Sequence, residues 1–126
     1  MVSHSSADAG FPATDSSALD RLRRFGGQKL LADMITLFLA AAPERIAAAR
    51  LGLTRHDPNA VEQALHALKS SAAQLGAMRM QRLSEQGELL ARAGSLEGAP
   101  ALLTELEAER ERVHLWLSAA RDGAGA

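Results

Sequence analysis

Apolar residues recur at helical spacing along the middle of this chain, and this pattern restricts the fold more than any other feature. Between residues 61 and 75 they follow steps of four, three, four and three, at Val61, Leu65, Leu68, Ala72 and Leu75. An α-helix turns once in about 3.6 residues, so these positions form one continuous stripe. The stripe predicts an amphipathic helix that packs its apolar face against other helices.

The N-terminal part of the chain predicts a short helix followed by a long apolar run. Ser16 or Ser17 can cap the short helix, and Gly26-Gly27 can end it. Its apolar positions are Leu19, Leu22 and Phe25. The next set keeps the helical period past Pro43, at Leu31, Ile35, Phe38, Ala42, Ile46, Ala49 and Leu53. We therefore expect either one kinked helix or two nearly coaxial helices, the second beginning at Pro43.

Turn and cap residues divide the rest of the chain into three helices. Asp57-Pro58 can begin the helix of the central stripe, and Gly76 can end it. The following helix has its apolar face at Met80, Leu83, Gly87 and Leu90 and should end near Gly94. Pro100 begins the last helix, with apolar positions at Leu102, Leu106, Val113 and Leu117. Glycine costs a helix about 1 kcal/mol relative to alanine, so Gly87→Ala should stabilise the fold if there is room for a methyl group.

The composition favours an all-α fold, because β-branched and aromatic residues are scarce. A chain of 126 residues suits one domain with one core. Short connections make sequential helices antiparallel, so we expect an up-down antiparallel four-helix bundle with a short N-terminal helix. The predicted domain covers residues 16–121, between a disordered leader (1–15) and a disordered tail (122–126).

Charge and composition also restrict the partners and the location. The net charge of −1 with interspersed signs offers no basic face, so nucleic acid is not an expected partner. No cysteine is present, which suits a reducing compartment. The start lacks a signal-peptide pattern, and no apolar run approaches membrane-spanning length. We expect a cytoplasmic monomer without membrane contact.

One histidine lies off the central apolar stripe, where a role in core packing is excluded. His66 has Glu62, Lys69 and Ser70 as neighbours one turn away, so its imidazole lies on a polar strip beside a cation. An exposed neutral imidazole is a nucleophile near physiological pH. The pattern around it consists of His66, Leu68, Lys69, Ser71, Leu75, Gly76 and Ala77.

This pattern resembles the histidine-containing phosphotransfer (HPt) domain family. The resemblance extends from about residue 17 to 118 through Asp20, Phe25-Gly26-Gly27, Phe38, Ala42-Pro43-Glu44 and Glu88. Two positions depart from it, because the family usually has glycine at Ser70 and a large apolar residue at Gly87. The resemblance implies a phosphorelay intermediate that takes a phosphoryl group on His66 from the aspartyl phosphate of one receiver domain and passes it to another.

Several site roles follow if the resemblance holds. Lys69 would stabilise the charge on the phosphoryl oxygens. Either Ser70 or Glu62 would hold Nδ1 of His66, and the small Ser70 would also leave room for the partner. Glu88 is interpreted as a solvent-facing or helix-pairing carboxylate.

The expected partners are receiver domains of response regulators or of a hybrid sensor kinase. The chain has no Gly-rich nucleotide loop and no pattern for a metal site, so we expect a phosphocarrier that is not an enzyme and has no cofactor of its own. Mg²⁺ would arrive with the acidic pocket of the partner receiver. The alternative is a non-catalytic four-helix adaptor that regulates a receiver or kinase by docking alone.

Overall fold

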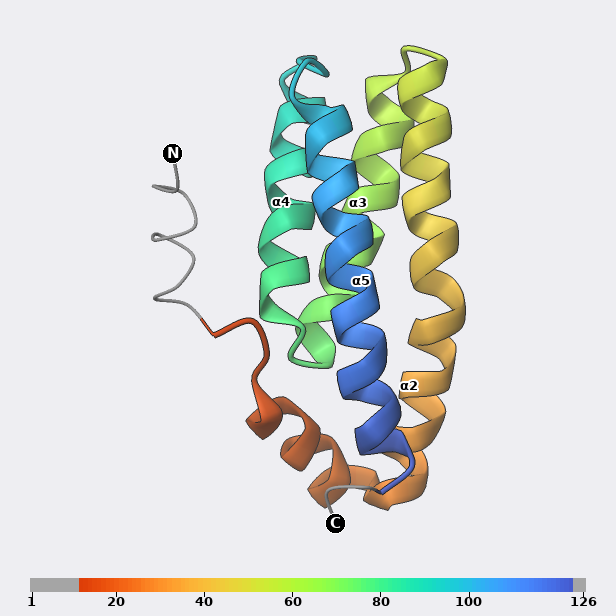
Figure 1. Cartoon of the computed structure of the whole chain (residues 1–126), viewed down its shortest axis with the longest axis vertical. Helices are drawn as coiled ribbons and strands as arrows, with labels where there is room; N and C mark the ends of the chain where they lie inside the picture. The colour runs from red at the N-terminus through yellow and green to blue at the C-terminus, as the bar shows by residue number, and fades with distance from the viewer. Residues whose placement is uncertain (1–11, 124–126) are drawn as a thin grey trace.

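The computed structural model describes residues 12–123 and contains four helices and no strand within that range. They are α2 (Ser16–Thr54), α3 (Pro58–Gln74), α4 (Met78–Arg92) and α5 (Ala99–Arg121). Figure 1 shows the long part of α2 and the other three helices lying side by side, with the start of α2 turned across the lower end. The all-α class predicted from the sequence is confirmed.

Helix α2 consists of a short and a long part that meet at Gly27. The backbone of Gly27 has φ 80° and ψ 177°, a conformation that glycine adopts without steric cost. Asp15 caps the short part, since its side chain accepts the Ser17 backbone N–H at 3.0 Å; the predicted caps Ser16 and Ser17 were wrong by one or two positions. Phe25 is 87% exposed, so it does not belong to the buried face that we predicted.

The long part of α2 runs through Pro43 without a break. Gly27 is the only residue inside α2 with non-helical backbone angles, so no second helix begins at Pro43. The other predicted boundaries are confirmed. Asp57 caps α3 by accepting the Ala60 N–H at 3.1 Å, and Gly76 follows α3 with φ 76°. Gly94 comes two residues after α4, and Pro100 lies in the first turn of α5.

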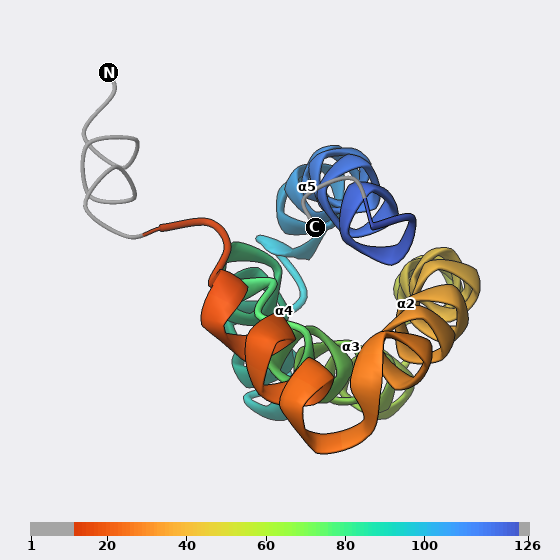
Figure 2. The same cartoon turned by 90° about the horizontal axis from the view of Figure 1, so that it is seen from below.

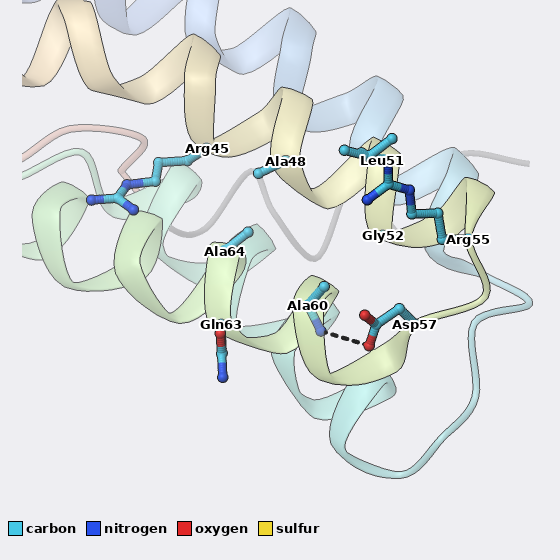
Figure 3. Close-up of a pocket in the computed structure, with 9 residues that line it drawn as sticks. All are labelled: Arg45, Ala48, Leu51, Gly52, Arg55, Asp57, Ala60, Gln63 and Ala64. Carbon is cyan, nitrogen blue, oxygen red and sulfur yellow. Dashed lines mark hydrogen bonds between the residues drawn. The ribbon is translucent and has the colours of Figure 1, made fainter.

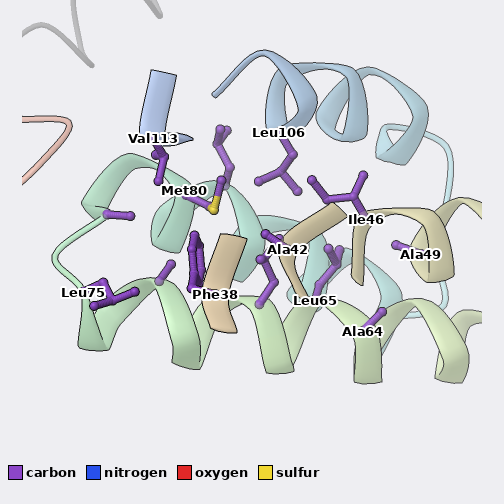
Figure 4. Packing of buried hydrophobic residues seen from close by; sticks show 14 of the residues in the cluster. Phe38, Ala42, Ile46, Ala49, Ala64, Leu65, Leu75, Met80, Leu106 and Val113 are labelled. Carbon is purple, nitrogen blue, oxygen red and sulfur yellow. The ribbon is translucent and has the colours of Figure 1, made fainter. Parts of the chain in front are cut away.

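The four helices form a closed ring in which each packs on two neighbours. Helices α3 and α5 both contact α2 and α4. Figure 2 looks along the bundle and shows this ring, with the start of α2 crossing beneath α3 and α4. Figure 4 shows apolar side chains of all four helices meeting inside it, among them Ile46, Leu65, Met80 and Leu106. No helix in the described range is both long and apolar enough to cross a membrane.

The segment before α2 lies against the turn between α3 and α4. The Asp15 N–H donates to Gly76 O at 2.8 Å, and the Arg79 N–H donates to Ala13 O at 3.1 Å. A side chain on Gly76 would collide with Asp15 O, so both its backbone angles and this contact favour glycine. The disordered leader was predicted to cover residues 1–15, but Ala13 and Asp15 are held against this turn by these two hydrogen bonds. Residues 1–11 and 124–126 lie outside the described residues.

The expectation for Gly87 is corrected by its packing. Gly87 lies on the buried face of α4, as predicted. A Cβ at this position would lie 2.5 Å from Leu102 Cδ2 and still closer to Leu65 Cδ1. A methyl group would therefore fit only if the side chains of Leu65 on α3 and Leu102 on α5 moved away.

Candidate functional site

The antiparallel pair α3 and α4 positions the candidate site. Residues equally distant from the turn lie opposite each other across such a pair. His66 and Glu88 are each eleven residues from Ala77, and Glu62 and Arg92 are each fifteen residues from it. The two helices therefore bring together a histidine, two carboxylates and an arginine from positions far apart in the sequence.

Glu88 lies at the centre of this cluster and is the partner of His66. The distance from His66 Nδ1 to Glu88 Oε2 is 2.7 Å. Arg92 Nη2 donates to the same oxygen at 3.0 Å, and Lys69 Nζ lies 2.7 Å from Glu88 Oε1. The Glu88 side chain is only 2% exposed, whereas that of His66 is 60% exposed. A buried carboxylate thus anchors an imidazole that faces solvent.

The surroundings of Glu88 keep its carboxyl group ionised. Burial raises the pKa of Glu88, but the hydrogen bonds and charges of Lys69 and His66 outweigh it and hold that pKa below its usual range. An ionised carboxylate only accepts hydrogen bonds, so Nδ1 of His66 carries the proton and donates it. In the neutral ring this leaves the lone pair on Nε2. The geometry thus selects the tautomer in which Nε2 can act as a nucleophile.

The residues that we expected beside His66 have other contacts. Glu62 Oε2 accepts Arg92 Nε at 2.9 Å, so Glu62 holds Arg92 and not the imidazole. Ser70 is exposed and makes no hydrogen bond with His66 within the described residues. Neither of the two predicted partners of Nδ1 is found there, because Glu88 occupies that position. Lys69 is only 25% exposed and its ammonium group is paired with Glu88.

Neither Glu88 nor Arg92 was assigned to the site from the sequence, although a signal for both was present. Glu88 follows Gly87 and lies four residues after the buried Ser84 and three before the buried Ala91, so it falls on the inner side of α4. Counting from the turn would have paired Glu88 with His66 and Arg92 with Glu62. Of the two interpretations of Glu88, solvent-facing is wrong and helix-pairing is confirmed, since Glu88 is buried and pairs with His66 and Lys69 of α3. A buried carboxylate is tolerated where cations surround it.

A second buried carboxylate has a different set of partners. Glu109 on α5 is 1% exposed and pairs through Oε1 with Arg112 at 2.9 Å and Arg79 at 3.4 Å. It joins α5 to the start of α4, and it has no hydrogen bond or ion pair with a histidine among residues 12–123. No group of three or more metal-ligating side chains occurs in the described part of the chain.

The surface around His66 is hollowed on the side of α4. This hollow has a volume of about 520 Å³. Its lining residues are Asn59, Glu62, Gln63, His66, Glu88 and Arg92. The arrangement can present a nucleophilic nitrogen at the edge of a polar depression that is open to a protein partner.

Comparison with known proteins defines the class of this chain. The family model of the Hpt domain matches residues 33–116, which is most of the chain, and the chain belongs to this family. It has a histidine phosphotransfer role in phosphorelay signalling, in which Hpt domains interact with receiver domains.

A solved structure has the same fold. The crystal structure of histidine-containing phosphotransfer protein B (HptB) from Pseudomonas aeruginosa matches with a TM-score of 0.83 at 24% sequence identity, covering 89% of this chain and 96% of that one. No curated protein matches the chain in sequence. The similarity confirms the helical bundle predicted from the sequence.

Proposed function

We propose that His66 is the residue that accepts and donates the phosphoryl group. The observation that carries this proposal is the hydrogen bond of 2.7 Å between Nδ1 and the buried Glu88. It fixes the ring by one nitrogen and leaves the other exposed. Nε2 attacks the phosphorus of an aspartyl phosphate, the N–P bond forms, and the bond from phosphorus to the aspartate oxygen breaks and releases the carboxylate.

Glu88 supports this step through charge. When Nε2 forms the bond to phosphorus while Nδ1 keeps its proton, the ring gains positive charge. The carboxylate at Nδ1 stabilises that charge and keeps the ring orientation for the return step. The pKa of Glu88 is held below its usual range, so the carboxylate is available at neutral pH.

Lys69 and Arg92 supply positive charge beside the imidazole. Both are paired with Glu88, so their positions are fixed before the phosphoryl group arrives. Lys69 has the role of stabilising phosphoryl oxygens in this proposal, and it also neutralises the buried Glu88. Ser70 contributes by its small size, since its exposed side chain leaves the approach to His66 open.

The proposed partners are receiver domains of response regulators or of a hybrid sensor kinase. The groove between α2 and α3 contains an apolar area beyond Ser70, where Leu37 is 71% exposed next to Met34 and Gln74. An exposed apolar area beside a reactive residue suits a transient protein interface. Any Mg²⁺ would be held by the receiver, and this chain would act as a carrier without kinase chemistry of its own.

The test is phosphoryl acceptance by the wild type and by His66→Gln. Incubation with a panel of phosphorylated receivers should give acid-labile label on the wild type and none on the variant, while thermal unfolding stays similar because His66 is exposed. Label that persists on the variant would refute the assignment of His66. Receiver binding without any label on the wild type would support an adaptor that works by docking alone.

A further inference from the structure

A second groove lies between α2 and α3 toward the end of α2. It has a volume of about 340 Å³, and its lining residues are Arg45, Ala48, Leu51, Gly52, Arg55, Asp57, Ala60, Gln63 and Ala64. Figure 3 shows Arg45 at one end of this groove and Leu51 with Arg55 at the other. Its floor is made of small residues, since the two helices approach closely where Gly52 meets Val61.

The charged residues of this groove differ in whether their side chains have a partner. The side chains of Arg45 and Arg55 are exposed, and neither guanidinium group makes an ion pair or hydrogen bond within the described residues. Asp57, the only carboxylate in the lining, caps α3 by accepting the Ala60 N–H. The lining therefore carries a net positive charge in a chain whose net charge is −1. Leu51 adds an apolar side chain that is 49% exposed.

The groove lies close to the candidate phosphorylation site. An added Cβ on Gly52 would lie 2.9 Å from Val61 Cγ2, so these two residues are level with each other. Because α2 and α3 run antiparallel with the same rise per residue, Arg45 is level with Leu68 and hence within one turn of His66. Gln63 lines both this groove and the hollow at His66, so the two depressions are neighbours on the surface.

We infer that Arg45 and Arg55 select the receiver domain by pairing with carboxylates on its surface, on either side of an apolar contact with Leu51. This inference rests on the proposed function, because it assigns the groove to the same partner that exchanges the phosphoryl group with His66. Arg45 lies on α2 and Arg55 is the residue that directly follows its end, so their backbones are separated by about 15 Å. The matching receiver presents two acidic side chains at a similar separation with an apolar side chain near one of them.

Complementary charges at the edge of an interface mainly affect association and specificity. The arginines therefore act on docking and leave the chemical step at His66 unchanged. Arginine also suits this role because its planar guanidinium group pairs with a carboxylate through two hydrogen bonds.

The experiment compares the double variant Arg45→Glu/Arg55→Glu with Arg24→Glu and the wild type. Arg24 is the control for an arginine charge reversal elsewhere, at half the charge change, because its side chain is also exposed and unpaired within the described residues but lies on the short part of α2, outside this groove. Transfer is measured over a range of receiver concentrations, with the receiver that reacts fastest with the wild type. Direct phosphorylation of His66 by potassium phosphoramidate, which needs no docking, is measured on all three proteins.

The inference predicts that the double variant loses at least about fivefold in the second-order rate constant of transfer at low ionic strength. The maximal rate at saturating receiver and the reaction with phosphoramidate should stay as in the wild type. The loss should shrink at about 0.5 M salt, where exposed charges are screened. Equal transfer by the double variant and the wild type, or an equal loss in Arg24→Glu, would overturn the inference. Absence of transfer to the wild type itself would instead refute the proposed function.

Discussion

Replacing Glu88 by glutamine tests the central contact of the site. Glutamine keeps the shape of the side chain but removes the negative charge and one of the two accepting oxygens. In the wild type, one oxygen of Glu88 faces His66 and Arg92 and the other faces Lys69. In the variant, the amide NH₂ group must face at least one of these donors.

The expected loss of stability in Glu88→Gln depends on how exposed the partners of Glu88 are. Leaving a buried polar group without its partner costs about 1–3 kcal/mol, and breaking a fully buried ion pair costs about 3–5 kcal/mol. His66 is 60% exposed and Arg92 57%, so both can be rehydrated, and only Lys69 stays largely covered. We therefore expect the free energy of unfolding to fall by about 1–3 kcal/mol, which lowers Tm by roughly 4–12 °C.

Phosphoryl transfer should fall by roughly tenfold, because one orienting hydrogen bond is worth about 1–1.5 kcal/mol. ¹⁵N NMR of the imidazole provides an independent measurement. The wild type should have its proton on Nδ1, and Glu88→Gln should show a mixture of the two tautomers. Unchanged tautomer and transfer rate in a folded variant would refute the orienting role of Glu88.

The pH dependence of stability checks the role of the charge. The pKa of Glu88 is held below its usual range in the folded protein, so the ionised carboxylate stabilises the fold above the pKa of an unfolded glutamate. This stabilisation is lost as the pH falls through the lower, folded pKa. Urea titrations between pH 7 and 3 give the difference in unfolding free energy between the wild type and Glu88→Gln. This difference should be largest at neutral pH and should shrink as the pH falls. A difference that stays constant over this range would show that charge is not its cause.

Substitutions at Lys69, Ser70 and Gly87 separate the contributions of neighbouring residues. Lys69→Ala should slow transfer without abolishing it, because positive charge beside the phosphoryl group is lost. It should also lower Tm, since Glu88 loses its partner at Oε1. A wild-type transfer rate at low ionic strength would exclude a role for the ammonium group. Ser70→Phe should transfer poorly, because its bulk blocks the approach to His66, while Tm stays nearly unchanged. Ser70→Gly should transfer at least as well as the wild type. Normal transfer by Ser70→Phe would refute the argument that a small side chain is needed at this position. Gly87→Ala should lower the free energy of unfolding by about 1 kcal/mol, because overpacking of about 1–3 kcal/mol exceeds the gain in helix propensity. Leu102→Ala in the same chain should reduce that loss, and equal losses in both backgrounds would contradict the clash.

The sequence determined the helices and most of their boundaries. Helical spacing of apolar residues and local caps act within a few residues, so Asp57, Gly76 and Pro100 could be assigned without a structure. The same spacing placed His66 off the buried face, which identified it as the candidate nucleophile. The predicted start of α2 was less accurate, because Asp15, Ser16 and Ser17 are all good capping residues.

The partners of His66 were decided only by the tertiary structure. Reasoning within one helix considers residues three or four positions away, and it proposed Glu62 and Ser70. Glu88 belongs to the next helix and reaches His66 because α3 and α4 are antiparallel about a tight turn. The effect of a methyl group at Gly87 depends in the same way on side chains of α3 and α5. Local periodicity shows which face of a helix is buried, but only the packing of helices brings together residues distant in sequence, and both the buried carboxylate and the core contact arise from that packing.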